Sequence, residues 1–256
     1  MTRYRATLAY DGTAYQGFQR QAGSTPTIQL ALEQALVRVT GQTATVTGAG
    51  RTDTGVHATG QVIAFDVAWR HSDADLLRAL NAVLPDDIAL QDIAPQPGFH
   101  PRFDAVARLY TYDVLNAPQR QPLLRRRAWH VWTPLDRDAL DVAAALLLGE
   151  HDFATFGQPP QGTNTVRAVL RSEWAAQPVN GGALLRYTIE ANAFLQHMAR
   201  RIVGMMVDVG RGALTLAQFE AAFRAADLAQ AGTLAPPHGL VLAQVRYDPH
   251  PRPFPR

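Results

Sequence analysis

One carboxylate of the chain, Asp53, lies in a glycine-rich stretch two residues after Arg51. The stretch reads GAGRTDTGVHA over residues 48–58, so glycines flank the acid on both sides. Glycine permits positive φ and lets the backbone approach another molecule closely. An Asp close to an Arg indicates a carboxylate that is kept ionised and oriented, as a nucleophile must be. Asp is also common in turns for its own hydrogen-bonding reasons, so these residue types alone leave a purely structural role open.

Composition excludes several kinds of chemistry. The 256 residues contain no Cys, which removes disulfides, thiolate nucleophiles, zinc–thiolate sites and iron–sulfur clusters. All 24 basic residues are Arg, so a Schiff-base lysine and a P-loop lysine are excluded as well. The histidines His57, His100 and His197 are far apart and lack the spacing of metal ligands. We therefore do not expect a zinc site.

The arginines fit a nucleic-acid partner. A guanidinium is planar, always charged and suited to bidentate phosphate contacts, although genome base composition can produce the same bias. The net charge is only +2, so an RNA-binding surface must come from local clusters. The candidate clusters are Arg125–Arg127 and the group of Arg200, Arg201 and Arg211, each short enough to be an ordinary solvated face.

The sequence also bears on the compartment. No apolar run approaches the roughly 18 residues that a membrane span needs. The first residues, MTRYR, pass directly into an alternating pattern rather than into a signal peptide. With no cysteine in the chain, we expect a soluble cytoplasmic protein without membrane association.

The elements around Asp53 follow from periodicity. Thr2–Tyr10 alternates like a strand and ends in an Asp-Gly turn. Thr25 and Pro26 predict a helix start, the apolar residues after them recur with helical spacing, and Gly41 supplies the stop. The other elements expected in this half are strands over 43–47, 60–67 and 88–93 and a helix over 72–84.

The second half repeats this order. We expect strands over 108–115, 166–175, 183–191 and 240–247 and helices over 136–148, 194–209 and 215–226. Short connections between many strands favour an α+β fold with largely antiparallel sheets over a doubly wound parallel sheet. The repeated order predicts two similar halves, 1–105 and 106–248, with a cleft between them. A Pro-rich tail at 249–256 should be extended or disordered.

Several motifs, taken in order and spacing, resemble the tRNA pseudouridine synthase A family. They are YDGT at 10–13, GFQRQ at 17–21, GRTDTGVHA at 50–58, FHPRF at 99–103, RLYTY at 108–112 and NAFLQHMAR at 192–200, which leads into IVG at 202–204. The resemblance runs from about Tyr4 to Tyr247. The motif that contains Asp53 is highly specific, and the others are strong in combination.

The resemblance implies a pseudouridine synthase fold with two similar α+β halves around a central RNA-binding cleft. It implies a homodimeric isomerase that converts uridine to pseudouridine at positions 38–40 of the tRNA anticodon arm without a metal or cofactor. Asp53 matches the family's nucleophile, and Arg51 matches a residue that flips out and holds the nucleotide. Tyr110 matches the tyrosine that stacks on the target base. Arg200 matches the partner of the catalytic carboxylate.

Each of these roles has a physical reason and an alternative. A carboxylate can attack the base or assist departure at C1′, and the sequence leaves both routes open. Arg51 can instead be a surface cation in a turn. Tyr110 can instead pack in the core, although Tyr112 on the same strand face is the stronger core candidate. His100 is either an RNA contact or a turn residue.

Two other functions fit parts of the sequence. Asp53-Thr54-Gly55 matches the Asp-Thr-Gly of aspartic proteases, but that chemistry needs two carboxylates that share one proton. A nearby Arg51 would stabilise the fully ionised state and oppose such sharing. The second alternative is an RNA-binding protein without catalysis, in which Asp53 only shapes a turn. For an RNA isomerase we expect Asp53→Asn to abolish pseudouridine formation while tRNA binding largely survives, and full activity of this variant would show that Asp53 is not the nucleophile. A protease would instead cleave peptides at acid pH and ignore tRNA.

Overall fold

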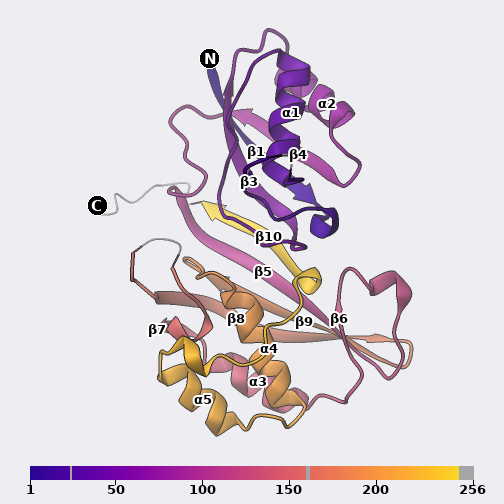
Figure 1. Ribbon diagram of the computed structural model, residues 1–256, viewed down its shortest axis with the longest axis vertical. Helices are drawn as coiled ribbons and strands as arrows, with labels where there is room; N and C mark the ends of the chain where they lie inside the picture. The colour runs from indigo at the N-terminus through magenta and orange to yellow at the C-terminus, as the bar shows by residue number, and fades with distance from the viewer. Residues whose placement is uncertain (24, 160–161, 248–256) are drawn as a thin grey trace. The chain divides into compact units, whose positions relative to one another are not determined.

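A computed structural model describes residues 1–23, 25–159 and 162–247 of the chain (Figure 1). Its contacts divide the chain into two compact units, Met1–Val106 with Leu242–Arg256 and Ala107–Val241. Both units combine helices with sheets whose strands pair largely antiparallel, which confirms the predicted α+β class. The Pro-rich tail predicted at 249–256 lies outside the described residues.

The first unit contains a sheet with the strand order β4-β1-β3-β10. The strands are β1 (Thr2–Tyr10), β2 (Thr47–Gly48), β3 (His57–Val67), β4 (Ile88–Pro95) and β10 (Leu240–Tyr247), of which β10 belongs to this unit from Leu242 onward. β1 pairs antiparallel with both β3 and β4, and β2 pairs antiparallel with β3. Alternate β1 residues are buried, as the alternation predicted.

Two helices, α1 (Ile28–Thr40) and α2 (Asp73–Val83), pack together in the first unit (Figure 1). α1 ends where predicted, because Gly41 adopts the left-handed conformation with φ 69°. Its start differs from the prediction: the N-cap is Thr27, whose side chain accepts from the Leu30 amide at 3.3 Å, and not Thr25. Pro26 instead uses its carbonyl to accept from the Gln16 amide at 2.9 Å.

The second unit contains strands in the order β5-β9-β8-β7. They are β5 (Ala105–Asn116), β7 (Gly149–Asp152), β8 (Val166–Val179) and β9 (Gly182–Ala191), and β6 (Trp129–Val131) pairs parallel with β5. The pairs β5–β9, β8–β9 and β7–β8 are antiparallel. β8 continues past the predicted end at residue 175 to Val179, and a tight connection at Gly181, with φ 77°, joins it to β9.

Helices α3 (Arg137–Ala145), α4 (Met198–Gly210) and α5 (Leu216–Arg224) pack together in the second unit (Figure 1). α3 ends at Ala145, before the predicted Leu148, because the amides of Leu147 and Leu148 donate to carbonyls three residues back, at 3.2 and 3.3 Å, in a turn tighter than an α-helix. α4 begins at Met198, not at Phe194, because the left-handed His197 with φ 65° keeps the preceding residues out of the helix. Short 3₁₀ turns complete the described chain at Gly12–Ala14, Pro122–Leu124, Ala154–Phe156, Leu228–Gln230 and Pro237–Gly239.

Candidate active site

Asp53 lies in an irregular turn between β2 and β3 of the first unit. The Val56 amide donates to the Asp53 carbonyl at 3.1 Å, and Gly55 adopts φ 77°. A positive φ at the third residue of a four-residue turn is the position that requires glycine. Asp53 itself is half-buried, whereas Arg51 is exposed. The Asp53 carboxylate is therefore carried by a hydrogen-bonded turn, and the Arg51 guanidinium by the segment just before it.

Thr52, the residue before Asp53, is fixed through both its backbone and its side chain. Its carbonyl accepts from the Phe18 amide at 3.1 Å. Its hydroxyl lies 2.7 Å from the Tyr10 hydroxyl in a buried hydrogen bond. Thr52 is only 6% exposed, so water does not compete strongly for the groups that form these two bonds. These contacts leave the backbone of Asp53 little freedom to move.

Two glycines of the loop after β1 let that loop approach the Asp53 turn. A Cβ on Gly12 would lie 2.0 Å from the Val56 carbonyl oxygen, closer than any side chain can come. A Cβ on Gly17 would lie 2.8 Å from the Thr52 carbonyl oxygen, and Gly17 also needs its φ of 83°. Gly12 and Gly17 thus permit contacts between two loops of the protein itself.

His57, just after the turn, contacts the loop that packs on it. Its ring is 1% exposed, and its Nδ1 accepts from the Gly12 amide at 3.0 Å. Asp11 Oδ1 also lies 3.0 Å from this Nδ1. The Gly12 amide always carries its proton, so Nδ1 serves as the acceptor here, and Asp11 Oδ1 instead accepts from the amide and hydroxyl of Thr13. His57 therefore holds the loop after β1 in place.

Tyr15 connects the same loop to the segment before β4. Its hydroxyl donates to Asp87 Oδ1 at 2.6 Å, and its carbonyl accepts from the Gly55 amide at 3.4 Å. Burial and the neighbouring Asp87 carboxylate raise the pKa of Tyr15 well above its usual range. The phenol therefore stays protonated and donates this hydrogen bond at neutral pH.

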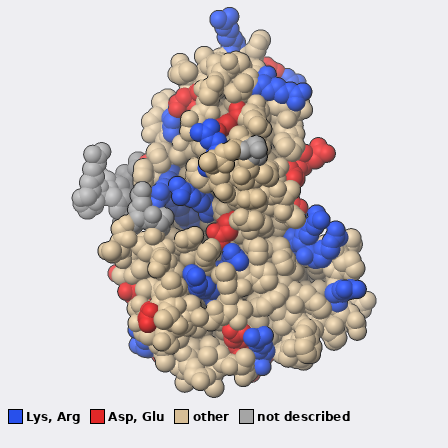
Figure 2. All heavy atoms as spheres, in the orientation of Figure 1, with Lys and Arg blue, Asp and Glu red and all other residues tan. Residues whose placement is uncertain are grey.

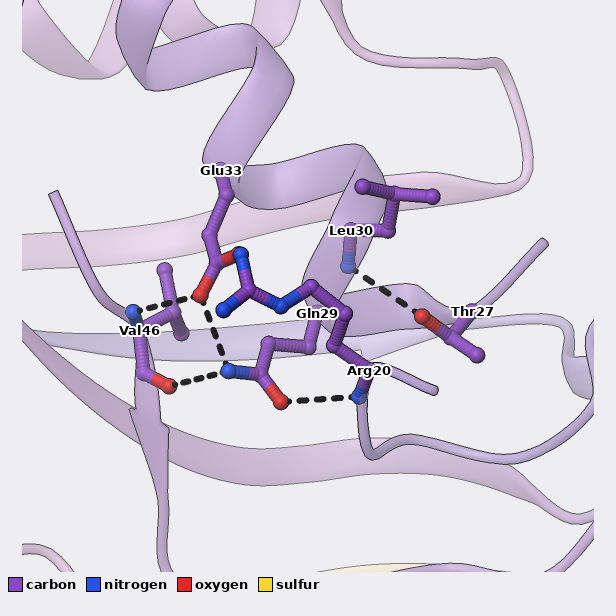
Figure 3. A network of polar contacts seen from close by, with 6 residues as sticks. All are labelled: Arg20, Thr27, Gln29, Leu30, Glu33 and Val46. Carbon is purple, nitrogen blue, oxygen red and sulfur yellow. Dashed lines mark hydrogen bonds and ion pairs between the residues drawn. The ribbon is translucent and has the colours of Figure 1, made fainter. Parts of the chain in front are cut away.

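A network around Glu33 of α1 connects two segments that precede the Asp53 turn in the sequence (Figure 3). Glu33 Oε1 accepts from the Val46 amide at 3.1 Å and from Gln29 Nε2 at 2.8 Å, while Oε2 pairs with Arg20 at 2.9 Å. Gln29 accepts from the Arg20 amide at 2.9 Å and donates to the Val46 carbonyl at 3.1 Å. One helix thus fixes the loop that ends near Arg20 and the segment that leads into the Asp53 turn.

Tyr110 lies on β5 in the second unit, where it pairs with Ile189 of β9. Its ring is 4.8 Å from that of Phe194, at 72° to it, and the residue is 9% exposed. Tyr112, two residues later on the same face, is 1% exposed and donates its hydroxyl to the Pro236 carbonyl at 2.7 Å. Burial raises the pKa of Tyr112 far above its usual range, and the charge of Arg200 opposes part of this effect.

Arg200 lies in the first turns of α4, also in the second unit. Its Nε donates to the Ala235 carbonyl at 2.8 Å, and the Ala235 amide donates back to the Arg200 carbonyl at 3.2 Å. The segment before Ala235 packs tightly on α4, since a Cβ on Gly204 would lie 1.8 Å from the Thr233 carbonyl oxygen. The backbone around Arg200 is therefore well fixed.

The four predicted site residues fall into two pairs. Arg51 and Asp53 belong to the turn of the first unit, and Tyr110 and Arg200 belong to the second unit. That all four act on one substrate stays a prediction. Sequence reasoning missed the Tyr10–Thr52 hydroxyl pair and the Glu33 network, because these partners come from separate elements and show no spacing signal.

The charged side chains form no single large patch of one sign on the visible face (Figure 2), and the titratable groups do not assemble a metal site within the described residues. On the face that Figure 2 shows, both basic and acidic side chains occur and much of the surface is uncharged. Over the described ranges, no three His, Asp or Glu side chains group in a way that could hold a metal ion. Within those same ranges, no helix combines the length and the hydropathy of a membrane span.

Comparison with known proteins identifies relatives along most of the chain. A family model described as tRNA pseudouridine synthase matches residues 6–104 and 143–248. The tRNA pseudouridine synthase A of Neisseria gonorrhoeae is 42% identical over 96% of this chain and 92% of its own length. The proteins of the same name from Methylacidiphilum infernorum and Chloroflexus aurantiacus are 40% and 43% identical, over 96% and 94% of this chain and 96% and 87% of their own lengths.

Solved structures are more distant. The archaeal box H/ACA sRNP Nop10–Cbf5 complex aligns with a TM-score of 0.34 and 13% identity, over 80% of this chain and 44% of that chain. A likeness of this size bears on neither the fold nor the function.

Proposed function

The chain belongs to the tRNA pseudouridine synthase family, and we propose that it isomerises uridine to pseudouridine at positions 38–40 of the tRNA anticodon arm. The observation that carries this proposal is the Asp53 turn, a carboxylate held by a fixed loop network within a chain whose relatives are 40–43% identical along nearly its whole length. An isomerase of this kind needs one oriented carboxylate, which the turn supplies.

The reaction is balanced within the nucleotide. The N1–C1′ bond of uridine breaks, a C5–C1′ bond forms, the proton on C5 is lost and N1 gains a proton. No electrons are gained or lost overall, so the step requires no redox partner. The carboxylate of Asp53 either adds to the base or stabilises the electron-poor C1′ after departure, and it is released when the C5–C1′ bond has formed. Both routes place the same carboxylate beside the same ribose.

The remaining residues are proposed to hold the nucleotide. A base in a helical stem must be extruded before a side chain can reach it, at a cost of a few kcal/mol. Arg51 is exposed and next to the fixed Thr52, which suits a residue that occupies the vacated stack or holds a phosphate. Tyr110 offers an aromatic face whose orientation Phe194 sets. Arg200 is proposed to pair with the Asp53 carboxylate and keep it ionised.

The family relation leads to further proposals about organisation. We propose that the halves 1–105 and 106–248 are similar domains that enclose an RNA-binding cleft, and that two copies of the chain form a homodimer. We also propose that the protein acts in the cytoplasm and needs no metal or cofactor. Sedimentation of the purified protein tests the dimer, and activity in the presence of a chelator tests the metal independence.

The direct test is incubation with an unmodified tRNA transcript, followed by mapping of pseudouridine by carbodiimide-blocked reverse transcription. We expect stops that report pseudouridine at positions 38–40. A matched transcript with cytidine at those positions should give no stops. Pseudouridine elsewhere in the tRNA would keep the chemistry and reject the substrate position. A protein that binds tRNA without making any pseudouridine would be an RNA-binding protein, and cleavage of peptides at acid pH would indicate the protease alternative.

A further inference from the structure

The turn at residues 100–104, in the first unit, displays an aromatic side chain on the surface. Phe103 is 72% exposed, whereas Phe99, four residues earlier, is 4% exposed. A single exposed apolar side chain is ordinary and requires no explanation by itself. What needs an explanation is the way this ring is supported.

Two planar groups flank the Phe103 ring. The His100 ring is stacked on it, with centroids 4.2 Å apart and planes at 28°. The Arg102 guanidinium lies 5.8 Å from the centroid of Phe103. The exposed part of the ring is thus a flat surface beside a permanent positive charge. This combination is typical of proteins that stack unpaired bases and hold the adjoining phosphates.

Hydrogen bonds within the turn fix the ring in this position. His100 Nδ1 accepts from the amides of both Arg102 and Phe103, each at 3.2 Å. The His100 amide donates to Asp104 Oδ2 at 2.8 Å, and the Asp104 amide donates back to the His100 carbonyl at 3.1 Å. A ring that is already oriented loses little conformational entropy when a ligand stacks on it.

The turn is also anchored to the core of its unit. The Phe99 carbonyl accepts from Arg3 Nε at 2.7 Å, and the Pro101 carbonyl accepts from the Tyr247 hydroxyl at 2.7 Å. The rings of Phe99 and Tyr247 lie 5.1 Å apart, and the Arg5 guanidinium lies within 5.6 Å of both centroids. Phe103 is therefore presented from a rigid base and not from a loose loop.

We propose that Phe103 and Arg102 form an auxiliary binding site for an unpaired nucleotide of the RNA substrate, in which the base stacks on Phe103 and Arg102 contacts the adjoining phosphate. This inference rests on the proposed function only for the identity of the RNA as tRNA. It assigns His100 the role of a positioning residue, because the imidazole orients the ring without contacting the nucleotide.

The test is equilibrium binding of an unmodified tRNA transcript to the full chain, with Asp53→Asn present in every variant so that no turnover occurs. Phe103→Ala and Phe103→Leu should both weaken binding about 5- to 100-fold, and Phe103→Trp should bind as tightly as the parent, because stacking needs an aromatic face. The salt dependence should separate the two residues. Phe103→Ala should leave the slope of log Kd against log salt unchanged, whereas Arg102→Ala should reduce it by about 0.7–0.9, the contribution of one phosphate contact.

Trp132→Ala is the matched control, since Trp132 is 71% exposed and lies in the other unit. Weakening by Phe103→Ala that is no larger than that of Trp132→Ala would overturn the proposal. Full binding by Phe103→Leu would also overturn it, because only packing would then matter. Dissociation of a dimer by Phe103→Ala in sedimentation would assign the surface to a second copy of the chain. If tRNA binding does not depend on Phe103 while the wild-type enzyme forms pseudouridine normally, this site alone is rejected. If binding depends on Phe103 but the wild-type enzyme forms no pseudouridine, the proposed function alone is rejected.

Discussion

Asp53 and Tyr110 are held in contrasting ways. Asp53 lies in irregular backbone, and its position depends on single contacts such as the Tyr10–Thr52 hydroxyl pair and the Phe18 amide. Tyr110 lies within a regular strand, where pairing with Ile189 and packing against Phe194 set its place. The loss of one bond in an irregular turn moves its neighbours, whereas a strand distributes the same loss over a ladder of bonds. The residue proposed for chemistry thus depends on more fragile support than the residue proposed for substrate binding.

Gly12→Ala should cause the largest loss of stability and of activity among the variants that test this contrast. The new Cβ would lie 2.0 Å from the Val56 carbonyl oxygen, so the loop and the Asp53 turn must separate. We expect the free energy of unfolding to fall by about 3 kcal/mol and activity to be lost, as for overpacking of a tight contact. Thermal unfolding and single-turnover rates measure both effects. Gly50→Ala is the matched control, since a Cβ on Gly50 meets nothing within 4 Å and its stability should change by less than about 0.5 kcal/mol. Equal Tm values for the two variants would show that the close approach does not matter.

Tyr110→Ala should come next, through substrate binding. Loss of the aromatic face should raise the Kd or KM for tRNA about 5- to 100-fold, the effect of one base–aromatic stack. Tyr110→Phe keeps the face and the contact with Phe194, so its Kd should stay within about twofold of the parent. The measurement is tRNA binding together with steady-state kinetics. Wild-type binding by Tyr110→Ala would make Tyr110 a packing residue only.

Tyr10→Phe should have a smaller and more selective effect. It leaves the buried Thr52 hydroxyl without its phenol partner, a loss of about 1–3 kcal/mol in a buried site. We expect the single-turnover rate at saturating enzyme to fall about tenfold with tRNA affinity unchanged, because the contact positions Asp53 and not the RNA. Thr52→Ser keeps the hydroxyl and should retain most of the rate. A change in Kd with no change in rate would contradict the comparison between the two regions.

Ser72→Ala should have the smallest effect on function. Ser72 caps α2 in the same unit, and its hydroxyl accepts from the Asp75 amide at 3.2 Å. Removal of such a cap lowers the free energy of unfolding by about 1 kcal/mol. The saturated rate should not change, because the cap does not contact the Asp53 turn. A fall in rate that matched that of Tyr10→Phe would show that any loss of stability in this unit impairs the enzyme.

Much of the fold could be predicted because its signals are local. Strand alternation predicted β1 with its observed bounds, and the strand predicted over 240–247 matches β10. The helices predicted over 72–84 and 215–226 begin within one residue of the starts of α2 and α5. The errors came from backbone that tertiary contacts determine. The left-handed His197 delays α4 by a few residues, and no periodicity indicates it.

The candidate site was predictable only in part, for a related reason. The residue types around Asp53 identify an oriented carboxylate, and the motif resemblance extends this to Tyr110 and Arg200. The support of the turn depends on partners far apart in sequence, such as Tyr10 with Thr52, 42 residues apart, and Glu33 with Val46, 13 residues apart. Such pairs arise from the packing of loops on a helix, which one sequence does not encode in any spacing.

The central claim is that the Asp53 carboxylate performs the chemistry on a tRNA uridine. The most direct measurement compares the wild type with Asp53→Asn, which keeps the size of the side chain, for both pseudouridine formation and binding of the same unmodified transcript. We expect Asp53→Asn to lose more than about 10⁴-fold in single-turnover rate, as removal of a nucleophile does in other enzymes, while its Kd stays within about threefold. An Asn variant that still formed pseudouridine at the wild-type rate would contradict the claim.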